Sequence, residues 1–246
     1  MFVSNPRRAP SNYEQGMTRS VLVFVGVVLG IAFMMGCAKI DVHLKTVNVR
    51  SSTIYCLFDP SCTVTVTNSS TTPIPIKAGG TAFLESRTFV GKPGTPASGL
   101  YGYEYRIDLS KAVETMVDVG GVATKQIPCL LSMTLEVGPI IETLDYDGDG
   151  KAGDLIYVVT SGGPGRIGLE HIHGWSNNIV LDFDSPICVG ASGGTGNSTY
   201  FVGFVSAHPP RSVTATVKET AGLTEKSTKI ENLPRYDVLV HAPQIR

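Results

Sequence analysis

The stretch that decides the fold is Leu100–Leu109, which reads LYGYEYRIDL. Tyrosine and isoleucine alternate there with glycine, glutamate, arginine and aspartate, so an extended chain would have one apolar and one polar face. This period of two, carried by aromatic and β-branched residues, is typical of a half-buried antiparallel strand. The pattern predicts a strand on which Tyr101, Tyr103 and Tyr105 share one face.

The same alternation recurs along most of the chain after Ile40. Clusters rich in glycine, proline and serine separate the runs and are expected to form turns. About ten to twelve short strands joined in this way predict an all-β fold, an antiparallel β-sandwich. Only Ser110–Asp118 has helical spacing, and it is expected to form the single short helix. The other alternating runs are DVHLKTVNV (41–49), CTVTVTN (62–68), LLSMTLEV (130–137), DLIYVVTS (154–161), NIVLDFD (178–184), STYFVGFVS (198–206), SVTATVKE (212–219) and YDVLVHA (236–242).

The composition narrows the class of protein. Of the 246 residues only 17% are charged, against about 25% in a typical globular domain. With 27 Gly and 15 Pro the chain is rich in turn-forming residues. This composition disfavours a helical bundle, a coiled coil and a disordered protein. The net charge of -1 offers no electrostatic surface for nucleic acid.

The N-terminal segment has the features of an export signal. Three arginines within the first 19 residues precede the apolar run Val21–Met35, which is shorter than the roughly 20 residues of a membrane-spanning helix. The run leads into Met-Gly-Cys, which resembles the bacterial lipobox. The resemblance implies that residues 1–36 are removed and that Cys37 is lipidated. A plain anchor helix or an ordinarily cleaved signal peptide is the alternative interpretation.

This interpretation divides the chain into three parts. Residues 1–36 are expected to be the signal peptide or membrane anchor, 37–78 a segment of N-terminal strands and linker, and 79–246 the β-sandwich domain. Pro73 and Pro75 suit an edge strand or a linker at the second boundary. The protein is expected to be exported to the bacterial cell envelope, either membrane-anchored or extracellular.

The four cysteines after Cys37 are an even number, as disulfide bonding in an exported protein requires. Cys56 and Cys62 bracket the short loop LFDPS and could pair with little difficulty. Cys129 and Cys188 would then pair with each other. Four cysteines allow three connectivities, and the sequence alone does not choose among them.

One motif carries specific chemistry, the segment LDYDGDGKAGDL that begins at Leu144. Asp145, Asp147 and Asp149 occupy alternate positions, a glycine follows, and Lys151 can offer its backbone carbonyl. This is the ligand order of positions 1, 3, 5 and 7 of a calcium-binding loop. Without a cation the three carboxylates would repel one another, so the loop is expected to fray or their pKa values to rise.

The end of the motif departs from an EF-hand, because position 12 is Ile156 instead of glutamate. The segment resembles the DxDGDG loops of dockerins, thrombospondin type 3 repeats and FG-GAP repeats, in which an aspartate closes the site. The resemblance implies a structural Ca²⁺ with Asp154 as the closing ligand, one residue later than the commonest spacing, and Glu142 is a second candidate. The alternative is an Asp-Gly hairpin tip that binds no ion.

Three weaker patterns have simpler interpretations. The run GASGG around Ser192 matches the GxSxG pattern of serine hydrolases, but a strand follows it where the hydrolase fold needs a helix. His171 and His173 share a strand face and could bind zinc, yet two histidines are more simply an exposed pair. The tyrosine stripe of LYGYEYRIDL could stack on sugars, although such stripes more often pack in a core.

Several long segments together carry one further resemblance: YGYEYRIDL, IPCLLSMTLEVGPI, LDYDGDGKAGDLIYVVTSGGPGRIGL, LDFDSPICVGASGG and FVGFVSAHPP. They resemble a group of exported bacterial β-rich proteins whose activity is uncharacterised, over about Thr81 to Pro243. The resemblance implies a shared fold and transfers no functional residue. In that pattern Cys129 and Cys188 flank the acidic segment, which is consistent with a disulfide that supports it.

The function expected from these features is that of a surface-anchored or secreted, non-enzymatic β-sandwich module. Such a protein would be a structural or binding lipoprotein with a structural calcium loop. A carbohydrate-binding or carbohydrate-acting secreted protein is the alternative. The expected partners are the membrane, reached through an N-terminal lipid or helix, and a cell-surface protein or glycan.

Overall fold

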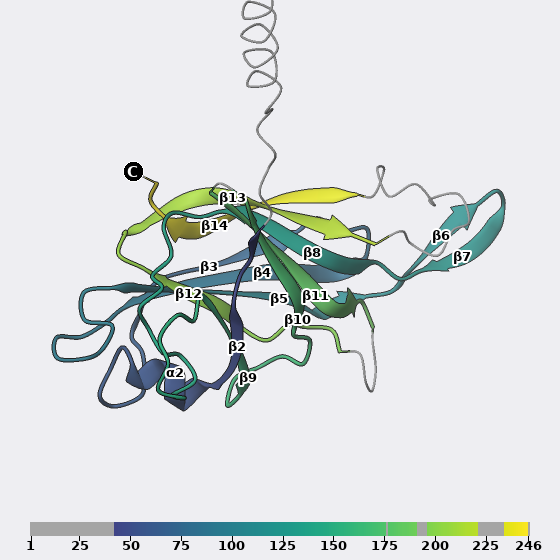
Figure 1. The fold of residues 1–246 in the computed structure, drawn as a ribbon. Helices are drawn as coiled ribbons and strands as arrows, with labels where there is room; N and C mark the ends of the chain where they lie inside the picture. The colour runs from purple at the N-terminus through teal and green to yellow at the C-terminus, as the bar shows by residue number, and fades with distance from the viewer. Residues whose placement is uncertain (1–41, 176, 191–195, 221–233, 246) are drawn as a thin grey trace, which may run out of the picture. The chain divides into compact units, whose positions relative to one another are not determined.

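The computed structural model describes residues 42–175, 177–190, 196–220 and 234–245 (Figure 1). All of them belong to one compact unit, Asp41–Arg246. Within it the strands form two six-stranded sheets and one two-stranded ribbon, and the described residues contain one short helix, α2 (Ser51–Cys56). The predicted all-β sandwich fold is therefore confirmed.

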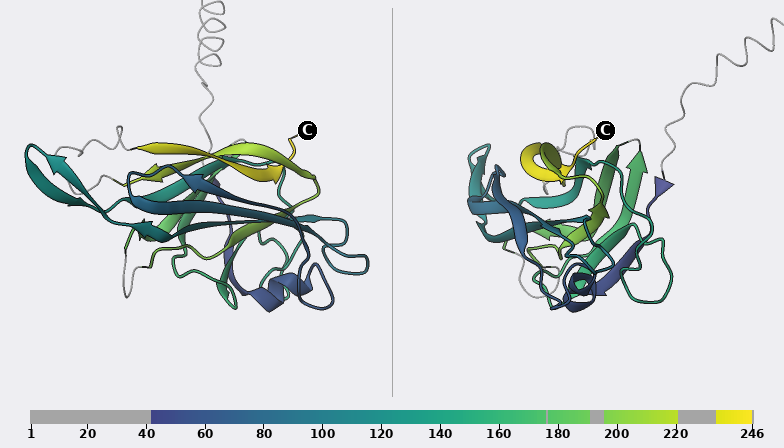
Figure 2. Two further views of the ribbon diagram at one scale, coloured as in Figure 1. Left: turned by 180° about the vertical axis from the view of Figure 1, so that it is seen from behind. Right: turned by 90° about the vertical axis from the view of Figure 1, so that its left-hand side faces the viewer.

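Sheet A has the strand order β1-β10-β11-β8-β13-β14, and every neighbouring pair in it is antiparallel. Sheet B has the order β2-β9-β12-β5-β4-β3 and is antiparallel except for the parallel pair β2–β9. The two sheets are seen from two further sides in Figure 2. The strands of sheet A are β1 (Val42–His43), β10 (Leu169–Trp175), β11 (Asn178–Cys188), β8 (Cys129–Glu136), β13 (Pro210–Glu219) and β14 (Arg235–Pro243); those of sheet B are β2 (Thr46–Arg50), β9 (Ile156–Ser161), β12 (Val202–Ser206), β5 (Tyr101–Val113), β4 (Gly79–Val90) and β3 (Val66–Ile74).

The main core lies between the two sheets and is built from the apolar face of each strand. On β5 the alternation observed in the sequence places Tyr103 and Tyr105 in this core, almost fully buried. Their hydroxyls donate hydrogen bonds to the backbone carbonyls of His208 and His241, at 2.7 Å each. The buried rings thus keep their polar atoms satisfied, and the stripe is not an exposed platform for sugars.

A second core covers part of the other face of sheet B. Ile54 of α2 and Phe58 just after it pack there with Phe89 of β4 and Val159 of β9. Strand β9 is consequently buried on both faces, since Ile156 and Val158 belong to the main core and Tyr157 and Val159 to the second. The alternation expected over 154–161 fails at IYVV, which is continuously apolar because β9 is buried on both sides.

The prediction of a helix at Ser110–Asp118 is wrong. Strand β5 continues to Val113, and β6 (Thr115–Val119) then pairs with β7 (Val122–Gln126) as a ribbon that extends beyond the two sheets (Figures 1 and 2). The decisive signal was the Gly120-Gly121 pair, whose φ angles of 65° and 87° form the tight hairpin turn. A hairpin turn at this point overrides the weak helical spacing before it.

The division expected at residue 78 is not a structural boundary. Strand β1 pairs with β10 in sheet A, whereas β2 and β3 pair with β9 and β4 in sheet B. Residues 42–78 therefore contribute strands to both sheets. The partners of β1 and β2 lie far along the chain, where local sequence patterns carry no information, and β3 pairs directly across the expected boundary with β4. The proposed signal, 1–36, and Cys37 lie outside the described residues. No helix in the described ranges is long and apolar enough to cross a membrane.

Two disulfides join Cys56 to Cys62 and Cys129 to Cys188. The first closes the loop that follows α2. The second links register partners on β8 and β11, at one end of their pairing. Paired disulfides of this kind point to an oxidising, extracellular setting.

Candidate metal centre

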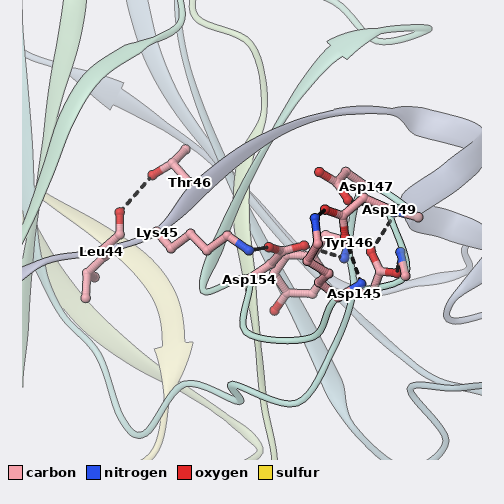
Figure 3. A network of polar contacts seen from close by, with 11 residues as sticks. Leu44, Lys45, Thr46, Asp145, Tyr146, Asp147, Asp149 and Asp154 are labelled. Carbon is pink, nitrogen blue, oxygen red and sulfur yellow. Dashed lines mark hydrogen bonds and ion pairs between the residues drawn. The ribbon is translucent and has the colours of Figure 1, made fainter.

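The acidic loop, defined here as residues 144–154, connects to β9 and is anchored by its apolar side chains. Leu144 and Tyr146 are buried in the second core. The ring of Tyr146 meets the ring of Tyr157 on β9 edge to face, with centroids 5.1 Å apart. Because the buried residues alternate with Asp145 and Asp147, the carboxylates emerge on the opposite side, as Figure 3 shows.

The loop folds around the carboxylate of Asp145. Its two oxygens accept hydrogen bonds from the backbone N–H groups of Gly148 and Gly150, at 2.7 Å each. Both glycines have positive φ angles, 79° and 85°, which residues with a side chain rarely adopt. The DxDGDG sequence therefore specifies this turn directly, through its glycines and through the acceptor that binds their N–H groups.

The three aspartates of the motif come together. One oxygen from each of Asp145, Asp147 and Asp149 lies within 4.8 Å of the others. Asp147 accepts a hydrogen bond from the backbone N–H of Asp149 at 3.0 Å, which fixes the direction of its side chain. The group offers only oxygen atoms, and oxygen ligands are what hard cations such as Ca²⁺ prefer.

The expected rise in carboxyl pKa does not occur at Asp149. Lys151 donates to it from its ammonium group at 3.0 Å and from its backbone N–H at 2.8 Å. These two hydrogen bonds lower the pKa of Asp149 below its ordinary value of 3.8. Positive charge from Lys151 and the peptide dipoles therefore offsets the mutual repulsion that the sequence suggested.

Asp154, the predicted closing ligand, is engaged at the base of the loop instead. Its carboxylate is almost fully buried, 2.7 Å from Lys45 Nζ, and accepts a hydrogen bond from the backbone N–H of Tyr146 at 2.8 Å (Figure 3). This pairing raises the pKa of Lys45 above its ordinary 10.5. The contact ties the loop to the chain just before β2. Glu142, the second candidate, is exposed.

A buried charged network lies next to the loop, on the same face of sheet B. Glu104 of β5 is fully buried and pairs with Arg87 of β4, whose Nε is 2.6 Å from the carboxylate. Tyr157 donates to the other carboxylate oxygen at 3.2 Å, and Arg87 donates a hydrogen bond to the hydroxyl oxygen of Tyr55 on α2. The guanidinium also lies 3.9 Å from the centroid of the Phe201 ring. Desolvation raises the pKa of Glu104 above its ordinary value of 4.5.

The alternation in the sequence placed Glu104 on the polar face of a half-buried strand and gave no sign of this network. The sequence did contain one signal of this network, the glycines within the strands, because a glycine inside a strand often marks a place where another side chain packs against the backbone. A Cβ on Gly102 would come within 2.3 Å of the Phe89 ring, and one on Gly203 within 2.4 Å of the Tyr157 ring. Both glycines therefore show that bulky side chains cover this face.

The other residues that the sequence suggested for a functional site lie in different parts of the molecule. Ser192 lies outside the described residues. His171 and His173 lie on β10 in sheet A on either side of the buried Ile172, so they share a strand face, as their spacing predicted. Lys151 sits at the tip of the acidic loop, with its ammonium group on Asp149.

No model of a known protein family, no curated protein and no solved structure matches this chain.

Proposed function

We propose that this chain is an exported, non-enzymatic β-sandwich module, tethered at the cell surface through Cys37, whose acidic loop binds a structural Ca²⁺ ion. The observation that carries the proposal is the convergence of Asp145, Asp147 and Asp149 in a loop whose sequence follows the calcium pattern. The two disulfides support an extracellular setting, where calcium is abundant.

The position of the loop supports a structural role for the ion. Tyr146 and Leu144 root the loop in the second core, and Asp154 fastens it to Lys45. An ion bound by the carboxylates would therefore hold the loop over the second core and stabilise that core. The ammonium group of Lys151 already supplies positive charge at Asp149, so calcium would have to displace it.

The tyrosine stripe gives the carbohydrate-binding alternative little support. Tyr103 and Tyr105 are buried in the main core and cannot stack on a sugar. Tyr101 is only partly exposed. A structural or binding module therefore has more support than a sugar-binding protein.

A calcium titration of thermal stability tests the loop. If Ca²⁺ binds the folded state alone, it adds roughly 2.7 kcal/mol to the free energy of unfolding at a hundredfold excess over Kd. Extracellular modules bind with Kd of about 10⁻⁴–10⁻³ M, so the melting temperature should rise at millimolar to tens of millimolar CaCl₂. Magnesium should be much less effective because it dehydrates reluctantly.

The Asp147→Ala/Asp149→Ala double variant should abolish the calcium shift. The matched control is Asp118→Ala, which removes another turn aspartate whose carboxylate accepts from Gly121 N–H at 2.6 Å, but in the β6–β7 ribbon. That control should keep the full shift. A melting temperature that ignores both calcium and chelator would show that the loop is a hairpin tip without a bound ion.

The tether has its own test. Cys37→Ala should release the protein from the membrane fraction and remove the lipid mass from the N-terminal peptide, as read by mass spectrometry. An unchanged mature mass and unchanged membrane association would reject lipidation at Cys37.

A further inference from the structure

Three of the five histidines in the chain gather on the face of sheet A that points away from the core. His171 and His173 flank the buried Ile172 on β10, so both point outward. His43 of β1 is the register partner of His173. The ring centroids are 4.4 Å apart for His43 and His173, 5.7 Å for His43 and His171, and 6.0 Å for His171 and His173.

Two of these imidazole rings lie near a carboxylate group. Asp182 of β11, the register partner of His171, has an oxygen 3.8 Å from His173 Nε2. Glu170 has an oxygen 3.8 Å from His171 Nε2. Histidines that bind metals commonly hold a carboxylate on one ring nitrogen, which orients the ring and makes the other nitrogen a better ligand.

The separations of the ring centroids, though not the present positions of the ring nitrogens, are close to what a single metal ion requires. With Zn–N bonds of about 2.1 Å and tetrahedral angles, the centroids of two bound imidazole rings lie about 5 Å apart. The three observed separations bracket that value. The ring nitrogens are less tightly gathered than the carboxylates of the acidic loop, so binding requires the rings to turn about χ2, which is a soft torsion for histidine.

We propose that His43, His171 and His173 form a surface site for one divalent transition-metal ion of the zinc class. Imidazole nitrogens suit Zn²⁺, Cu²⁺ and Ni²⁺, whereas Ca²⁺ and Mg²⁺ prefer oxygen ligands, so this site and the acidic loop select different ions. Asp182 orients His173, and water or a partner group completes the coordination. The side chains of His171 and His173 are 55% and 24% exposed, but Nδ1 of His173 is buried, so the ring of His173 has to turn toward solvent to bind the ion.

The site has a structural consequence for the start of the sandwich. Strand β1 is only two residues long and pairs with β10 alone. A metal held jointly by His43 and the two histidines of β10 fastens this short strand to sheet A. Metal binding therefore stabilises the first described strand of the chain.

Zinc binding by the full chain, prepared without a polyhistidine tag, tests the proposal. Titration calorimetry with ZnCl₂ should give one saturable site, and Co²⁺ should produce the visible absorption of a coordinated ion. Outer-shell partners alone are worth about 10–100-fold in affinity, so His43→Ala should weaken zinc binding by at least about 100-fold. Asp182→Asn should weaken it by about tenfold or more.

The matched control is His208→Ala, because His208 lies outside the cluster, in the segment between β12 and β13. It should bind zinc with unchanged affinity, as should the Asp147→Ala/Asp149→Ala variant. Absence of a saturable site, or equal zinc affinity in His43→Ala and the unmodified chain, would overturn the proposal. Loss of the zinc site in the aspartate variant alone would assign the ion to the acidic loop and equally overturn it.

Discussion

Both faces of sheet B contain buried side chains, but different kinds of contact bury them. The inner face packs against sheet A through apolar side chains such as Leu84 and Ile107. Part of the outer face is covered by α2 and the acidic loop, and this part contains the fully buried Glu104 with its partner Arg87. The stability of the inner face comes mainly from the apolar area and side-chain volume that it buries, and these contributions have no preferred direction. The stability of the outer face depends in addition on the geometry of its hydrogen bonds.

This difference has a consequence for stability. A buried ion pair adds little to stability as a pair, yet removal of one partner leaves a buried charge without compensation. An apolar core loses stability in proportion to the contacts and volume removed. Variants on the two faces should therefore differ in whether a second substitution can recover the lost free energy of unfolding.

The largest effect is expected from Arg87→Met on the outer face. It leaves Glu104 buried and unpaired, which should lower the free energy of unfolding by about 3–5 kcal/mol in urea denaturation. The double variant Arg87→Met/Glu104→Leu should recover most of that loss. As a control, Lys125→Met breaks the more exposed pair with Glu114 and should cost about 0–1 kcal/mol. A double variant no better than the single one would mean that the network is needed for packing and not only for charge balance.

A somewhat smaller effect is expected from Leu84→Ala on the inner face. Leu84 is fully buried in the main core, and such truncations cost about 2–5 kcal/mol through lost transfer energy and the cavity that remains. Because no charge changes, the loss should be the same at every pH between about 5 and 8. A loss that varies with pH would show that the inner and outer faces are energetically coupled across the sheet.

The smallest effect concerns pH and belongs to the outer face alone. Burial raises the pKa of Glu104 above 4.5, so over the interval above pH 4.5 the folded state retains a proton that the unfolded state releases. Stability is then complete below pH 4.5 and falls as pH rises through the folded-state pKa, by at most about 1.4 kcal/mol per pH unit.

The Glu104→Gln variant lacks this titration. The urea midpoints of the unmodified chain and of this variant, measured from pH 4 to 8, should therefore diverge as pH rises, with the unmodified chain losing stability relative to the variant. Parallel profiles would indicate that Arg87 keeps Glu104 charged in the folded state at all these pH values.

The same contrast explains which parts of the structure the sequence could predict. The inner face follows from period-two alternation, as in Tyr103, Tyr105 and Ile107, because that pattern is local. The burial of the outer face does not follow from the pattern, because polar residues such as Glu104 and Arg87 at the outward positions of a strand predict an exposed face. The elements that cover them, α2 and the acidic loop, lie well away from either residue in sequence.

The candidate site divides in the same way. Asp145, Asp147 and Asp149 were predicted together because their spacing within five residues defines the turn. The engagement of Asp154 with Lys45 could not be predicted, since the two residues are brought together only by the parallel pairing of β2 with β9. The third histidine of the cluster was missed for the same reason: His43 meets His173 only through sheet pairing.

The parallel pair β2–β9 also sets an order of assembly. Val47 pairs with Tyr157, and His43 with His173, so the first two strands have no partner until more than half of the chain is available. The hairpins β4–β5, β6–β7 and β13–β14 join strands that are neighbours in sequence and close with a smaller loss of chain entropy. Pairings between distant segments form slowly. The local hairpins should therefore form first, and β1 and β2, although made before them, should be the last to dock.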